Sequence, residues 1–153
     1  MAVEWNIDMP NLIAIASLIL VVLIFISEQR QLKKQMMLQN FSDYTSRYQQ
    51  ILLNLPLSIT DKDFDIDKLD KEEKEKVLKW MRVYFDLCAE EYLLHRKKLI
   101  DEEVWEDWLE GMIGTYNTPA FRNGWEIISQ NKDIYEKFKP FAQKEIFNIE
   151  PKK

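Results

Sequence analysis

The most apolar stretch of the chain is LIAIASLILVVLIFI, residues 12–26, in which Ser17 is the single polar side chain. About 20 mainly apolar residues are needed to span the hydrocarbon core of a bilayer. The stretch reaches that length when polar residues near its ends are included, and Pro10 suits the first turn of a helix, where its missing N–H costs nothing. The sequence therefore predicts a transmembrane helix over residues 9–28.

Two other kinds of segment are similarly apolar: a cleaved signal peptide and a buried helix of a soluble protein. A signal peptide begins with basic residues and ends at a small-residue cleavage site. Here Glu4 and Asp8 precede the run, and Ser-Glu-Gln-Arg follows it at residues 27–30. A buried helix normally keeps a polar stripe, and residues 12–26 have none. Both alternatives fit the sequence less well than a membrane span.

Basic residues lie on only one side of the predicted span. Arg30, Lys33 and Lys34 follow it, and no Lys or Arg precedes it. The positive-inside rule then places residues 1–8 outside, as a short exoplasmic N-terminus, and the rest of the chain in the cytoplasm. An unpaired Cys88 fits that reducing compartment. We expect a single-pass protein of the cytoplasmic (inner) membrane.

The composition of the whole chain excludes several classes of protein. With 153 residues, the chain is long enough for one small domain. Hairpin turns and phosphate-binding loops use several glycines, and this chain has only three. With one cysteine and one histidine, it cannot form a disulfide framework or one of the usual zinc sites. A net charge of −5 argues against nucleic acid as a partner. No cofactor is predicted.

Apolar residues continue at helical spacing beyond the predicted span. No glycine or proline interrupts residues 27–55, and we expect an amphipathic stalk helix over residues 29–55 that ends before Pro56. Its apolar stripe either packs against later helices of the same chain or forms a coiled-coil or docking surface for a partner. The positions of this stripe are Leu32, Met36, Met37, Phe41, Tyr44, Tyr48, Ile51 and Leu52.

The remainder of the chain predicts an all-α cytoplasmic domain over residues 71–150, after an acidic connector over residues 56–70. Asp70 and Glu73 have the spacing of a capping box and predict a helix from about Lys71 to Leu99. The buried stripe expected for this helix is Val77, Met81, Tyr84, Phe85, Cys88, Tyr92 and His95.

Three shorter helices are expected after the long one. Asp101 caps the first of them, and Thr118 followed by Pro119 starts the second. The third runs from about Lys132 and is disturbed at Pro140. The apolar side expected for the first is Val104, Trp105, Trp108, Leu109 and Met112.

The acidic connector is the first candidate site for a ligand. Its acidic residues follow the spacing of positions 1, 3, 5, 7 and 12 of a calcium-binding loop: Asp61, Asp63, Asp65, Asp67 and Glu72. Ile66 stands where such a loop needs glycine, and Lys62, Lys68 and Lys71 would oppose a divalent cation. A solvated loop is favoured, and calcium binding is the alternative.

A second group of acidic residues lies in the long predicted helix. Asp86 and Glu90 are four residues apart, as are Glu91 and His95, so each pair shares a helix face. Carboxylate-bridged di-iron sites use a second histidine, which this chain lacks. Cys88 has no electropositive setting to activate its thiol. We expect a charged helix flank and a buried thiol, with an enzyme built on the acidic residues as the alternative.

The aromatic residues are the remaining candidates for a functional surface. Trp and Tyr anchor both cores and interfaces, and five tryptophans are many for a chain of this size. Trp105 and Trp108 lie beside Glu106 and Asp107, so we expect one of the two tryptophans to be partly exposed. The predicted partner-binding residues are Met36, Phe41, Tyr44, Tyr48, Trp105 and Trp108. No catalytic, cofactor-binding or metal-binding residues are predicted.

Two segments carry a resemblance to a known group of proteins: FDLCAEEYLLHRKKLIDEEVWEDWLEGM, residues 85–112, and FRNGW, residues 121–125. Together they resemble an uncharacterised family of small bacterial proteins with one N-terminal membrane helix and a cytoplasmic helical domain of unknown function. The resemblance lies within residues 71–130; it implies the fold and the anchor, and no catalytic residues. The matching positions are Glu90, Glu91, Asp101, Trp105, Arg122 and Trp125.

These observations favour a binding role over catalysis. We expect a non-enzymatic, membrane-anchored module that binds another protein, as an accessory or assembly subunit of a bacterial membrane protein complex. Its partners would be the lipid bilayer and another membrane protein, with a homo-oligomer as a further option. The alternative is a membrane-bound sensor or regulatory domain that binds a small ligand, or Ca²⁺ at the acidic connector.

Overall fold

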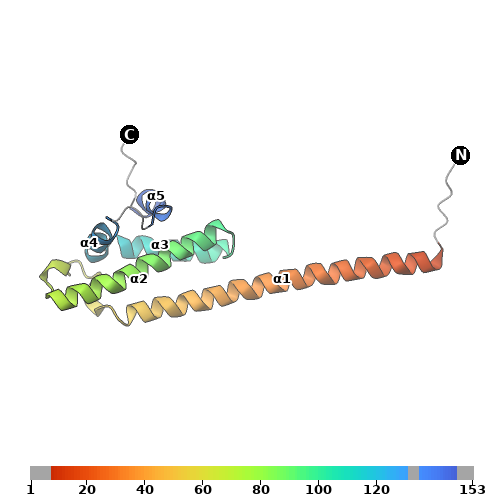
Figure 1. Ribbon diagram of the computed structural model, residues 1–153, viewed down its shortest axis with the longest axis horizontal. Helices are drawn as coiled ribbons and strands as arrows, with labels where there is room; N and C mark the ends of the chain where they lie inside the picture. The colour runs from red at the N-terminus through yellow and green to blue at the C-terminus, as the bar shows by residue number, and fades with distance from the viewer. Residues whose placement is uncertain (1–7, 131–134, 148–153) are drawn as a thin grey trace. The chain divides into compact units, whose positions relative to one another are not determined.

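The computed structural model describes residues 8–130 and 135–147, and every regular element in these residues is helical (Figure 1). The predicted all-α class is confirmed. The chain divides into two compact units, residues 1–39 and residues 40–153. Residues 1–7, most of the predicted exoplasmic segment, lie outside the described residues, as does the predicted start of the last helix at Lys132.

The first helix, α1 (Met9–Leu52), contains the apolar run. Asp8 starts the helix, because its carboxylate accepts a hydrogen bond from the Asn11 N–H at 3.2 Å. Every side chain from Asp8 to Met36 is exposed, and the apolar run is entirely uncovered by other parts of the described chain. A core helix of a soluble protein would be covered, so the exposed run is consistent with a single-pass membrane anchor.

The length of α1 exceeds what a bilayer needs. Its 44 residues extend, at about 1.5 Å per residue, over roughly 66 Å, against about 30 Å for the hydrocarbon core. The helix therefore continues into the predicted stalk, although it ends at Leu52 and not at Leu55. The side chain of Asn54 donates to the Gln50 carbonyl at 2.8 Å, and the following Pro56 disfavours helical backbone before it.

In the second unit, α2 (Lys71–Arg96) supplies the largest part of the core. Asp70 caps it as predicted, since its carboxylate accepts from the Glu73 N–H at 2.9 Å. The predicted stripe is buried from Val77 to Cys88, and Tyr92 and His95 are half-buried. The helix stops three residues before the predicted end, because Lys98 adopts a left-handed conformation (φ 57°) that closes its last turn.

The third helix, α3 (Glu102–Tyr116), begins at the predicted cap: the Asp101 carboxylate accepts from the Glu103 N–H at 3.1 Å. The next, α4 (Pro119–Ile128), starts at the predicted proline, but the Thr118 hydroxyl donates to the Thr115 carbonyl and does not cap it. A methyl group on Gly124 would collide with the sulfur of Met81, so glycine lets α4 approach α2 closely.

The C-terminal part of the described chain differs from the prediction of one last helix disturbed at Pro140. It consists of a one-turn helix, α5 (Phe138–Phe141), and a π-helical turn over Ala142–Ile146. Pro140 lies in the first turn of α5, where its missing N–H has no intrahelical acceptor to lose. In the middle of a long helix, a proline would remove one hydrogen bond and clash with the preceding turn. This explains why α5 begins at Phe138, only two residues before Pro140.

Aromatic rings fill the centre of the second unit. Phe85 and Tyr116 are fully buried with their ring centroids 5.0 Å apart, and Phe121 and Trp125 of α4 pack edge-on against Phe85. The connector forms two short 3₁₀ turns, Leu57–Thr60 and Ile66–Lys68, each with one buried isoleucine.

Candidate functional site

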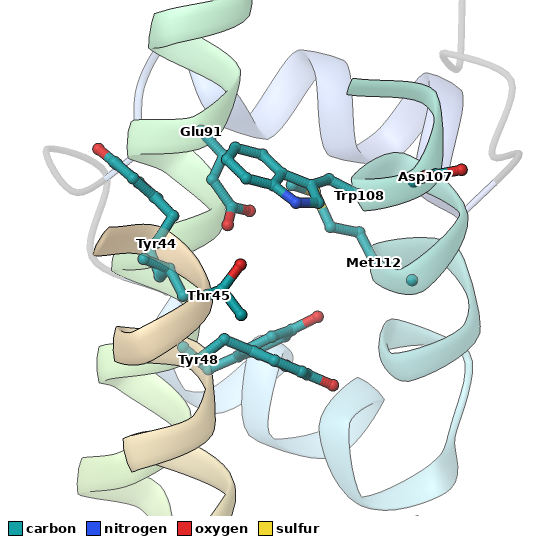
Figure 2. A pocket seen from close by; sticks show the side chains of 10 residues that line it. Tyr44, Thr45, Tyr48, Glu91, Asp107, Trp108 and Met112 are labelled. Carbon is teal, nitrogen blue, oxygen red and sulfur yellow. The ribbon is translucent and has the colours of Figure 1, made fainter. Parts of the chain in front are cut away.

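A pocket of about 180 Å³ lies within the second unit, between the last turns of α1 and the middle of α2 and α3 (Figure 2). Four aromatic rings and one buried carboxyl group line it. Its lining residues are Tyr44, Thr45, Tyr48, Tyr84, Leu87, Glu91, Asp107, Trp108, Gly111 and Met112. Helical spacing places these residues together, since 44 and 48 are one turn apart in α1, as are 84, 87 and 91 in α2.

An ion pair holds α1 beside α2 at the edge of the pocket. Arg47 donates to both oxygens of Glu90, at 2.6 and 3.3 Å, and the Tyr44 hydroxyl donates to the same carboxylate at 3.1 Å. The hydrogen bond from Arg47 lowers the pKa of Glu90, so this carboxylate stays ionised. Both side chains are nearly half exposed to solvent. The ion pair therefore fixes the position of α1 beside α2 but adds little to the free energy of unfolding.

Trp108 forms the opposite wall of the pocket, on α3. Its ring stacks on Phe41, with centroids 6.2 Å apart, and on Tyr44, with centroids 5.6 Å apart. Tyr48 contacts Tyr84 of α2 with ring centroids 6.2 Å apart. The aromatic stripe of α1 from Phe41 onward thus packs against helices of its own chain.

Glu91 is the unusual residue of the site. Its side chain is 7% exposed and points into the pocket (Figure 2). Within the described part of the chain it has no hydrogen-bond or ion-pair partner, although Arg47 attracts it electrostatically. Burial raises the pKa of Glu91 to about 8, with a smaller contribution from the negative charge of Glu90.

The inner end of the pocket adjoins buried hydroxyl and thiol groups. Tyr84, Cys88 and Tyr116 are all buried, and burial raises the pKa of each well above its usual value. The Tyr116 hydroxyl has no hydrogen-bond partner among the described residues. Cys88 is therefore a protonated core thiol, as predicted, and not an accessible nucleophile.

The predicted partner-binding residues fall into different surroundings. Met36 is exposed (43%) in the first unit, and Phe41 (44%) and Tyr48 (38%) are partly exposed in the second. Trp108 is half-buried, as expected for one of the two tryptophans, whereas Trp105 is 4% exposed and stacks on His95 in the core. Tyr44, Tyr48 and Trp108 meet at the pocket; the others do not line it.

The carboxylates of the acidic connector do not converge on one point. Asp65 accepts from the Asp67 N–H, and Asp67 pairs with Lys74 at 2.6 Å, an interaction that lowers its pKa. Asp70 is engaged as a helix cap. In the described ranges, no group of three or more His, Cys, Asp or Glu side chains is placed to hold a metal ion. Each of these three aspartates thus stabilises a local turn or helix end.

The acidic residues of α2 also separate into different roles. Asp86 accepts a hydrogen bond from the Tyr135 hydroxyl, and His95 lies 3.7 Å from Glu102, not against Glu91. Sequence reasoning treated Glu90 and Glu91 alike, as a charged flank. The position of Glu91 in the apolar spacing 77, 81, 84, 88, 91 was the signal that could have separated them, because it puts Glu91 on the buried stripe.

No family model matches the chain, and no curated protein or solved structure is significantly similar to it.

Proposed function

We propose that the chain is a non-enzymatic, membrane-anchored interaction module, an accessory or assembly subunit of a membrane protein complex. The observation that carries the proposal is the exposed apolar surface of α1 beyond a bilayer-length run. Leu32 and Met36 are 57% and 43% exposed and lie on one helix face, four residues apart. Exposed apolar stripes at this spacing serve as docking surfaces for partner helices.

The partner proposed for this stripe is a helix of another membrane protein. A neighbour anchored in the same bilayer can run beside α1 without the loss of orientational freedom that a soluble partner would suffer. The positive charges of Arg30, Lys33 and Lys34 support an arrangement with the N-terminus outside and the helical unit in the cytoplasm. The membrane proposed for this arrangement is a bacterial inner membrane, as predicted from the sequence.

A non-enzymatic role is supported by the state of Cys88 and of three of the carboxyl groups. Cys88 is buried with a raised pKa, and the carboxylates of Asp86, Glu90 and Asp67 are each engaged by a hydroxyl or a basic side chain. A general base or a nucleophile needs to reach a substrate. These groups are instead used to hold the helical unit together.

Native electrophoresis of mildly solubilised membranes tests the proposal. The full-length chain should migrate in a complex larger than itself, and Leu32→Asp with Met36→Asp should return it to the size of the free chain. The matched control is Gln31→Asp with Gln35→Asp, which adds the same charges on the same turns at exposed polar positions. Migration of the unaltered chain as a free monomer, or equal effects of both pairs, would contradict the proposal.

A further inference from the structure

We propose that the pocket around Glu91 binds a small, free organic ammonium ion, which the aromatic rings and the buried carboxylate recognise together. The site goes beyond the proposed function and does not depend on it, because every lining residue belongs to the second unit.

The first argument is the missing partner of Glu91. Glu91 is 7% exposed and has no hydrogen-bond or ion-pair partner among the described residues, so burial disfavours its ionised form. Arg47 attracts Glu91 electrostatically, but both of its terminal nitrogens are engaged by Glu90. A cation inside the pocket would supply the partner that the described chain does not.

The second argument is the chemistry of the walls. Figure 2 shows Tyr48 and Trp108 on two sides of the space into which Glu91 points. Tyr44 and Tyr84 also line the pocket, and the Tyr44 ring contacts Trp108 and the Arg47 guanidinium. The faces of Tyr and Trp rings attract cations within about 6 Å, and grouped aromatic rings are the usual receptor for alkylated ammonium groups. A metal ion would need several oxygen ligands, whereas Asp107, the other acidic lining residue, is exposed at the rim.

The third argument is size. The pocket holds about 180 Å³, which is somewhat more than the roughly 150 Å³ that accommodates a benzene molecule in an engineered protein cavity. A trimethylammonium or tetramethylammonium group is of this order of size. The pocket is partly open to solvent, so a short substituent such as the hydroxyethyl arm of choline could extend outward.

Binding should release a proton. With its pKa at about 8, Glu91 is mostly protonated at pH 7, and an ammonium ion favours the ionised form. The ionised fraction rises about tenfold between pH 7 and pH 9, so the dissociation constant should fall by about the same factor.

The other groups around Glu91 keep their charge over this range. Burial raises the pKa of the Tyr44, Tyr48, Tyr84 and Cys88 side chains, which stay neutral. Hydrogen bonding within their pair raises the pKa of Arg47 and lowers that of Glu90, which stay charged. Asp107 of α3 is the remaining acidic group at the pocket.

The test is calorimetric titration of the full-length chain with choline chloride at pH 7 and pH 9. The protein is held in a maltoside detergent and an amine-free buffer at constant ionic strength, so that neither detergent nor buffer offers a competing ammonium group. The neutral isostere 3,3-dimethyl-1-butanol and the lipid headgroup glycerophosphocholine are titrated in parallel. We expect choline to bind about tenfold more tightly at pH 9, and both parallel compounds to bind at least tenfold more weakly than choline.

Two variants distinguish the contribution of the Glu91 carboxylate to choline binding from that of any negative charge near the pocket. Glu91→Gln should abolish the pH dependence and weaken choline binding at pH 9 at least tenfold. The matched control Asp107→Asn removes the same charge from the pocket rim and should stay within about twofold. Tyr48→Leu, at a partly exposed position, should reduce the preference for choline over its isostere.

Three results would overturn the proposal. These are no choline binding at tens of millimolar, equal binding of the neutral isostere, and unchanged binding by Glu91→Gln. Tighter binding of glycerophosphocholine than of choline would assign the pocket to a lipid headgroup in place of a free ammonium ion.

Discussion

The acidic connector and the pocket around Glu91 both contain carboxyl groups, but the partners of these groups differ. In the connector, Asp65, Asp67 and Asp70 are engaged by backbone N–H groups or by a lysine, on a solvated surface. In the pocket, one carboxyl group is buried without such a partner. The comparison teaches that the number of acidic residues in a segment says less about a site than the partners each one has.

Glu90 and Glu91 show the same contrast between neighbours. The Glu90 carboxylate faces Arg47 and Tyr44, and its pKa is lowered by the hydrogen bond from Arg47. Glu91 points about 100° away around the same helix, into an apolar space, and burial raises its pKa. Identical side chains on one helix thus take opposite electrostatic roles.

The largest effect expected on stability comes from Glu91. Its pKa is about 8 in the folded chain against an ordinary value of 4.5, so the folded state binds more protons than the unfolded state between these two pH values. Stability therefore falls as the pH rises from 4.5 to 8, by at most roughly 5 kcal/mol at about 1.4 kcal/mol per pH unit. Glu91→Gln should remove this loss, leaving stability near pH 4 unchanged and raising it at pH 9.

Urea unfolding of both proteins in detergent, followed by tryptophan fluorescence at pH 4, 7 and 9, measures the difference. The difference curve isolates Glu91, because all other titrating groups are common to the two proteins. A constant difference across this pH range would mean that Glu91 is solvated like the connector aspartates, and the comparison between the two regions would fail.

An intermediate effect is expected from the connector residue that caps α2. Asp70→Ala removes the acceptor of the Glu73 N–H and should cost about 1 kcal/mol of unfolding free energy. Asp101→Ala, which removes the equivalent acceptor at the start of α3, should cost a similar amount. Thermal unfolding followed by circular dichroism compares the two variants. If both lose less than about 0.3 kcal/mol of unfolding free energy, these aspartates do not stabilise the helices by capping them.

The smallest effect is expected from the exposed connector carboxylates. Asp61→Asn and Asp63→Asn should each change stability by less than about 0.5 kcal/mol, because both side chains are exposed and make no hydrogen bond or ion pair with the described residues. Addition of 1 mM calcium chloride should leave the melting temperature of the unaltered chain in place. A rise in melting temperature with calcium that both substitutions abolish would show that the connector is a cation site after all.

Much of the fold was predictable because its signals are local. The apolar run of residues 12–26, the caps at Asp70 and Asp101 and the proline at the start of α4 each act within one or two helix turns. The C-terminal part was less predictable, since a proline such as Pro140 can either interrupt a helix or start one, and packing decides between them.

The candidate site was predictable only in part. The stripe residues Tyr44 and Tyr48 and the half-buried Trp108 were identified from spacing, and they meet at the pocket. The proposed ligand-binding group, Glu91, was not separated from Glu90, because both read as charged residues on a helix. The helical spacing of α2 places Glu91 on the buried stripe, but whether its carboxyl group finds a partner depends on how α1 and α3 cover α2.

The sequence by itself determined the helical class, the membrane-compatible helix and the helix starts, because hydrophobic periodicity and capping are properties of neighbouring residues. The tertiary structure alone decided the environments of Trp105, Trp108, Glu90 and Glu91. Trp105 is buried, whereas Trp108 is half-buried at the pocket. Glu90 pairs with Arg47, whereas Glu91 has no hydrogen-bond or ion-pair partner in the described chain. The physical reason is that burial and pairing are set by residues far apart in the chain, which only packing brings together.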